Sequence, residues 1–126
     1  MTDNKWQQFK GKGTYRLQDL GRPAMFLIPV KKLKRKIGKV SVEERLHKFL
    51  VAHFTAYTSS SIPSFGVWKG SDEKMVRDES RQYKVSFEGK DRLPVLIEEL
   101  ARIATLVEEE CIYFEAGQYA CLIYPE

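Results

Sequence analysis

The sequence predicts an α+β fold, and three observations lead to this prediction. Two segments carry apolar residues at helical spacing, one opening at Ser41 and the other at Asp91. Short runs rich in β-branched and aromatic residues lie around them, as is typical of strands. In chain order the elements read β-α-β-β-α-β-β. Two helices on one face of such an antiparallel sheet make the ferredoxin-like arrangement.

The N-terminal region differs in composition from the rest of the chain. Residues 1–23 mix Lys, Gly and Gln with isolated aromatic residues and show no sustained period, so we expect a basic, partly ordered N-terminal arm. Residues 24–126 then form a single ferredoxin-like domain, long enough to bury one core. Its first strand is the run "MFLIPV" at 25–30, in which Pro29 favours a sheet edge or a bulge.

The first helix begins at Ser41. Ser41 and Glu44 match the capping box S-x-x-E, in which each side chain satisfies a backbone donor of the other residue. The apolar stripe that follows contains Leu46, Phe49, Leu50, His53, Phe54 and Tyr57. The run "TSSSIPS" at 58–64 is expected to end this helix, because a Ser cluster followed by Pro does not continue one.

Two strands are expected next, at 64–69 and 82–87, with a polar connection at 70–78 between them. The second helix is expected to have Asp91 as its N-cap. Its apolar stripe contains Leu93, Ile97, Leu100, Ala104 and Val107.

The runs "CIYF" and "YACLIY" around "EAGQ" predict a closing β-hairpin. Its Cys111 and Cys121 are expected to be free thiols, as is usual in a cytosolic protein.

Charge is distributed unevenly along the chain. Residues 1–39 have a balance of +9 and residues 40–126 a balance of −5. The segment "KKLKRKIGK" at 31–39 leads into the helix N-terminus, whose free N–H groups suit phosphate. It predicts a site for a phosphate-bearing small molecule or an acidic protein partner, with a solvated basic loop as the open alternative. The candidate anion-binding residues are Lys31, Lys32, Lys34, Arg35, Lys36, Lys39 and Ser41.

The stretch "FGVWKGSDEKMVRDESRQYKVSF" resembles the PII/CutA-like superfamily. The resemblance covers residues 62–100 and includes Trp68 and Gly70, an acidic pair, Lys84 and the helical run "LPVLIEEL". It implies a ferredoxin-like fold and a trimer with ligand clefts between subunits. Exposed strand edges beside a charged tip also favour a homo-oligomer. The candidate interface residues are Trp68, Gly70 and Tyr83, and the alternative is that Trp68 covers the core of its own chain.

No nucleophile elbow, Walker A loop, dinucleotide-binding glycine motif or zinc signature occurs. His47 and His53 lie six residues apart, so they cannot form an i, i+4 metal pair; His47 is expected to be solvated. We therefore predict no catalytic residues, no metal and no cofactor. The predicted function is that of a non-enzymatic PII/CutA-like regulatory or ligand-binding protein that self-associates as a trimer.

An RNA- or DNA-binding ferredoxin-like module is the alternative function, because aromatic side chains on a sheet can stack on bases. The residues that would serve are Tyr83, Phe87, Tyr113 and Tyr119. The chain has no apolar run long enough to span a bilayer and no apolar leader at its start. The expected location is therefore the cytoplasm, without membrane contact.

Overall fold

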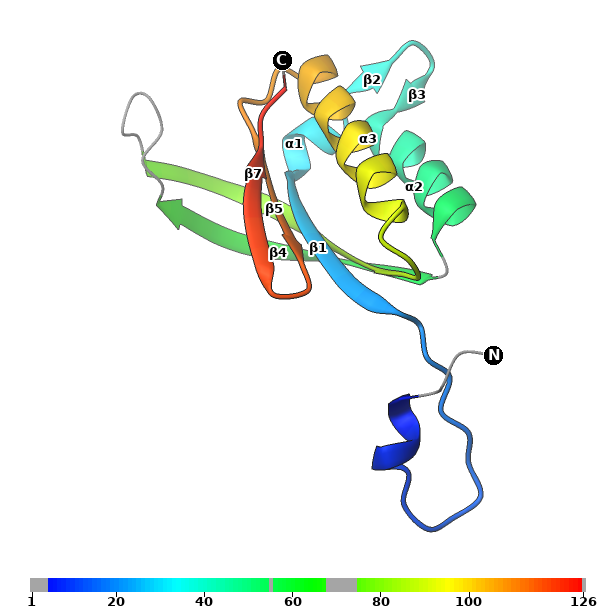
Figure 1. Cartoon of the computed structure of the whole chain (residues 1–126). Helices are drawn as coiled ribbons and strands as arrows, with labels where there is room; N and C mark the ends of the chain where they lie inside the picture. The colour runs from blue at the N-terminus through cyan, green and yellow to red at the C-terminus, as the bar shows by residue number, and fades with distance from the viewer. Residues whose placement is uncertain (1–4, 55, 68–74, 126) are drawn as a thin grey trace.

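The computed structural model describes residues 5–54, 56–67 and 75–125. Five antiparallel strands form one sheet in the order β4-β5-β1-β6-β7, with helices packed against it (Figure 1). The strands are β1 (Arg22–Pro29), β4 (Ala56–Val67), β5 (Met75–Phe87), β6 (Ile112–Ala116) and β7 (Tyr119–Ile123). The helices are α1 (Val30–Leu33), α2 (Val42–His53) and α3 (Arg92–Leu106). The α+β prediction is confirmed.

One hydrophobic core lies between the sheet and the two long helices. Along β1 the buried side chains alternate with half-buried ones, so Phe26 faces the helices while Leu27 faces away. Each long helix contributes its apolar stripe to the same core. The stripe residues are Val42, Leu46 and Leu50 from α2, and Leu96, Leu100, Ile103 and Ala104 from α3.

The start of α2 agrees with the prediction, and its end does not. Ser41 Oγ accepts a hydrogen bond from the Glu44 amide at 3.1 Å, which is the expected N-cap. The helix ends at His53. Tyr57, which was predicted to be helical, and the polar run that follows it belong to β4. Pairing with β5 outweighs the helical spacing of these side chains. Pro63 lies in β4, and an edge strand is the place in a sheet where a proline is tolerated, because only one side of its backbone is paired.

The basic segment is more structured than a loop. It contains α1 and a small hairpin of β2 (Lys36–Ile37) and β3 (Val40–Ser41), which turns at Gly38 with φ of 68°. Lys32 Nζ and Arg35 Nη1 both donate to the carbonyl oxygen of Val107, at 2.7 and 2.9 Å. These cations meet the partial negative charge at the C-terminus of α3.

The described part of the N-terminal arm lies away from the sheet and helices (Figure 1). It contains the 3-10 helix η1 (Lys5–Phe9), and Trp6 Nε1 donates to Asp19 Oδ1 at 3.1 Å. The strand β1 begins at Arg22, inside the segment expected to be the arm. Among the described helices, none has the length and apolar character needed to cross a membrane.

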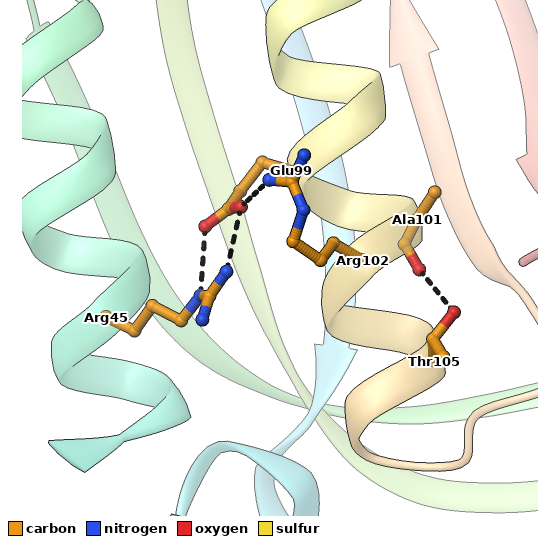
Figure 2. Close-up of polar contacts among 5 residues, drawn as sticks. All are labelled: Arg45, Glu99, Ala101, Arg102 and Thr105. Atoms are coloured by element: carbon orange, nitrogen blue, oxygen red, sulfur yellow. Dashed lines mark hydrogen bonds and ion pairs between the residues drawn. The ribbon is translucent and has the colours of Figure 1, made fainter. Parts of the chain in front are cut away.

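A buried carboxylate joins the two long helices (Figure 2). The Glu99 residue on α3 is only 4% exposed. Arg45 on α2 donates to it from Nε and Nη2 at 3.2 and 3.3 Å, and Arg102 donates from Nη1 at 2.7 Å. The charge of Glu99 is therefore paired from both helices, which is the condition under which a buried charge is tolerated.

Replacing Glu99 by Ala should lower the free energy of unfolding by about 2–3 kcal/mol, because two guanidinium groups lose their shared acceptor. Urea denaturation followed by circular dichroism measures this loss. The matched control is Lys48→Gln, which removes the exposed ion pair between Lys48 and Glu44 and should cost at most about 0.5 kcal/mol. Equal losses in the two variants would show that the buried Glu99 contacts stabilise the fold no more than an exposed ion pair does.

Candidate functional site

A cavity of about 330 Å³ lies between the first turns of α2 and the strands β4 and β5. We call it the α2–β5 cavity. Its lining residues are Ser41, Glu43, Glu44, His47, Tyr57, Ser59, Arg81 and Tyr83. A second cavity of about 290 Å³ lies at the other end of α2 and is lined by Ala52, His53, Phe54, Ser86, Phe87, Glu88 and Arg92.

Strand register and helix periodicity bring these lining residues together. In the β4–β5 ladder Ser59 pairs with Tyr83, and Tyr57 lies two residues before Ser59 on the same face. Arg81 lies two residues before Tyr83 on that face of β5. Glu43 and His47 stand four residues apart, so both point from one side of α2. The cavity therefore combines three segments that are distant in sequence.

The polar side of the cavity is organised by an ion pair between Arg81 and Glu43. Arg81 Nη1 donates to Glu43 Oε1. This hydrogen bond is the main cause that raises the pKa of Arg81 above its usual value. The Arg81 side chain is 22% exposed and that of Glu43 is 49% exposed, so the guanidinium is the more enclosed partner. With Glu44 also in the lining, carboxylates outnumber guanidinium groups in this cavity.

The opposite side of the cavity is aromatic. The Tyr57 hydroxyl and His47 Nδ1 share a hydrogen bond, and the two rings meet edge to face at 5.7 Å. Tyr83 stacks on Phe26 with a centroid distance of 5.1 Å and is only 3% exposed. Burial raises the pKa of the Tyr83 phenol, which keeps that group neutral at ordinary pH.

This arrangement suits a small organic cation with a flat apolar part. Aromatic faces attract cations, and carboxylates at the rim add a favourable field. The volume falls near the lower end of the range of small-molecule sites. A phenol and an imidazole in hydrogen-bond contact are groups that can hold or move a proton. The described residues include no cluster of three or more His, Cys, Asp or Glu that could bind a metal ion.

The predicted anion-binding residues lie mostly outside this cavity. Only Ser41 of that set lines it, and its hydroxyl already accepts the Glu44 amide. Lys32 and Arg35 donate to the Val107 carbonyl. The remaining cations of the set are exposed: Lys31, Lys34, Lys36 and Lys39.

The predicted interface residues are not tested by the single chain. Trp68 and Gly70 lie outside the described residues. Tyr83 lies in the core of its own chain, where it stacks on Phe26 and contributes to the cavity wall.

Sequence reasoning missed the residues that make the cavity polar. His47 is exposed, as expected, but Tyr57 lies in β4 and not in the helix, and the contact between their side chains was not predicted. Arg81 fell just before the strand expected at 82–87, so its place on the helix-facing side of β5 was not seen. The alternation of Arg81, Tyr83 and Val85 was the available signal, since it continues the pattern of that strand by one more step.

No protein-family profile and no curated protein matches this sequence. Two solved structures share its fold. A phage SAM lyase in complex with S-methyl-5′-thioadenosine has a TM-score of 0.60 and 12% identity, and a phage SAM lyase in the apo state has a TM-score of 0.51 and 15% identity. Each match covers 91% of this chain and 98% of the lyase chain. At such low identity the likeness shows a common fold.

This likeness overturns the functional prediction made from the sequence. The predicted non-enzymatic PII/CutA-like regulator, with a nucleic-acid-binding module as its alternative, is wrong, because the solved chains that share the fold are those of a lyase. The regulatory and anion-binding character expected of the basic segment likewise has no support. Two of its cations bind a backbone carbonyl of the same chain. The chain is similar in fold to phage SAM lyase structures.

Proposed function

We propose that this protein is an enzyme that cleaves S-adenosylmethionine (SAM) and releases S-methyl-5′-thioadenosine. The observation that carries this proposal is the likeness to the phage SAM lyase over nearly the whole of both chains. Fold alone does not determine function, so the proposal also needs a site of suitable chemistry. The α2–β5 cavity is the candidate site.

The α2–β5 cavity supports the proposal through its charge and its aromatic wall. SAM carries a sulfonium cation between an adenosyl group and an amino-acid chain. Tyr57, which is half-buried and lies 6.3 Å from the Tyr83 ring centroid, offers an aromatic ring to such a cation, while the buried Tyr83 closes the wall behind it. Glu43 and Glu44 lie in the same lining and can face a positive charge, although in the free protein they are paired with Arg81 and Lys48.

The reaction breaks the bond between sulfur and Cγ of the methionine part. Sulfur keeps the electron pair and becomes a neutral thioether, which is S-methyl-5′-thioadenosine. A lyase completes the step without water in one of two ways. The substrate carboxylate closes on Cγ to give a lactone, or a base removes a Cβ proton to give a vinyl amino acid. For the second route, His47 with its Tyr57 partner is the proton acceptor in the cavity.

The purified protein should convert SAM to S-methyl-5′-thioadenosine, which liquid chromatography detects. Because SAM also decomposes spontaneously, the comparison is with heat-inactivated protein, and proton NMR identifies the four-carbon product. Tyr57→Phe, which removes the hydroxyl that meets His47, should lower kcat by about 10-fold or more if that pair moves a proton. If the substrate carboxylate closes to a lactone instead, Tyr57→Phe should leave kcat almost unchanged.

The matched control is Arg92→Gln, which alters the second cavity and should keep full activity. No product above the heat-inactivated background, together with no thermal stabilisation by S-methyl-5′-thioadenosine, would contradict the proposed function.

The finer topology is also a proposal: we infer the ferredoxin-like arrangement. In a β-α-β-β-α-β unit of this kind, the first strand lies between the third strand and the last. The sheet order β4-β5-β1-β6 agrees with this, with β1 as the first strand, β5 as the third and β6 as the last. The long helices α2 and α3 fall at the two helical positions of that unit. The additional strand β7 extends the sheet beyond β6.

We propose in addition that the chain self-associates, as a trimer, through the face of the sheet that the helices do not cover. Met25 and Leu27 on β1 point to this face and are half-buried, and Tyr113 on β6 is also half-buried. Lys84, Gln82 and Glu115 are their cross-strand neighbours, so the face is of mixed character; apolar side chains on a sheet face without a covering layer favour a partner, and another copy of the same chain supplies a matching surface.

Light scattering after size exclusion should give a mass near three times that of the chain. Leu27→Glu, which places a charge on this sheet face, should shift the protein to the monomer while circular dichroism stays unchanged. The matched control is Val51→Glu on the exposed side of α2, which should not alter the mass. A monomeric wild-type protein at tens of micromolar would contradict self-association.

A further inference from the structure

The geometry of the α2–β5 cavity points to Arg81 as the receptor for the amino-acid carboxylate of the ligand. In the free protein, Glu43 occupies that receptor and is displaced when the ligand binds. This inference rests on the proposed function, since it assigns one end of SAM to one residue of the same cavity. It goes further by identifying Arg81 as the residue that distinguishes the substrate, which carries an amino-acid carboxylate, from the nucleoside product, which lacks one.

Arg81 is the residue in this lining that suits a carboxylate. Among the described residues that line the cavity it is the only Lys or Arg. A guanidinium presents several N–H donors in a planar fork that matches the two oxygens of a carboxylate. Its present acceptor is one carboxylate oxygen of Glu43, bound through Nη1, so the free protein already places a carboxylate on this guanidinium.

The two partners of this ion pair differ in how easily each can be replaced. Glu43 lies in the first turn of α2 and is about half exposed, so its carboxylate can turn to water at little cost. Arg81 is more enclosed and lies beside the buried Tyr83, so it needs an acceptor in every state. Exchange of one carboxylate for another therefore keeps Arg81 satisfied throughout binding.

The exchange makes Arg81 a source of selectivity between ligands. S-adenosylmethionine and its thioether analogue S-adenosylhomocysteine carry the amino-acid carboxylate. S-methyl-5′-thioadenosine lacks it and leaves the pair of Arg81 and Glu43 intact. A product that cannot compete for Arg81 has fewer contacts to lose, which favours its release.

Titration calorimetry with S-adenosylhomocysteine and S-methyl-5′-thioadenosine isolates the contribution of the ligand carboxylate to affinity, because the first probe has this carboxylate and the second does not. Arg81→Gln should weaken binding of S-adenosylhomocysteine by about 10- to 100-fold, which is the change in affinity expected when a charge-assisted hydrogen bond is lost. It should change binding of S-methyl-5′-thioadenosine by less than about 3-fold. Glu43→Gln should strengthen binding of S-adenosylhomocysteine by about 3-fold or more and leave binding of S-methyl-5′-thioadenosine unchanged, because the ligand carboxylate then has no charged competitor for Arg81.

Two further variants keep the test decisive. Arg81→Lys retains the charge without the planar fork and should give intermediate weakening of S-adenosylhomocysteine. Arg92→Gln in the second cavity is the matched control and should leave both affinities unchanged. Circular dichroism and urea denaturation establish that each variant is folded.

The outcomes distinguish the inference from the function on which it rests. If the wild-type protein binds both probes and Arg81→Gln weakens both equally, the carboxylate assignment is overturned while the proposed function stands. If Glu43→Gln weakens S-adenosylhomocysteine, Glu43 is a binding group and its role as a displaceable occupant is overturned. If the wild-type protein binds neither probe, the proposed function and the inference fall together.

Discussion

The placement of α2 is the constraint on which the rest of the candidate site depends. On one flank Arg45 of this helix binds the buried carboxylate of Glu99 on α3. On the other flank Glu43 meets Arg81 of β5, which lines the cavity. The apolar stripe fixes the depth of the helix against the sheet, but apolar contacts are non-directional and allow rotation and sliding. Directional bonds to the buried charge of Glu99 remove that freedom, so the α3 side of α2 has a defined position.

The elements with local causes were predictable from the sequence. The N-cap at Ser41 and the period-2 pattern at the end of β5 depend on residues close in the chain; the Ser41 cap appears as expected, and the strand expected at 82–87 is the last part of the longer β5. The end of α2 was not predictable in this way. Tyr57 continues the helical spacing of the preceding apolar residues, yet its ladder with β5 decides its conformation. Likewise, the basic segment docks because Lys32 and Arg35 reach Val107, which is more than 70 residues away.

The candidate site was less predictable than the fold because it has no local motif. Motifs for nucleophiles, metals and phosphates record chemistry in which the protein supplies the reactive group. A sulfonium substrate brings its own leaving group, and its cleavage needs mainly orientation and a suitable electrostatic environment. Such a site can be made from Glu, Arg and Tyr side chains placed by strand register, as Arg81 and Tyr83 are. The absence of familiar motifs therefore did not exclude an enzyme.

Under the proposed function, the charge arrangement in the cavity bears on rate as well as on binding. Cleavage of a sulfonium removes its positive charge, so a carboxylate in contact with sulfur would stabilise the substrate more than the transition state. Such a contact would improve affinity and slow the reaction. Pairing Glu43 with Arg81 prevents that contact in the free protein, and a displaced Glu43 has open solvent beside it. Sulfur is then left to the Tyr57 side, whose weaker attraction holds the cation and opposes the loss of its charge less than a carboxylate would. Under the proposed function Arg81 would therefore serve the reaction by receiving the ligand carboxylate, while the displaced Glu43 would turn to solvent and away from the reacting atom.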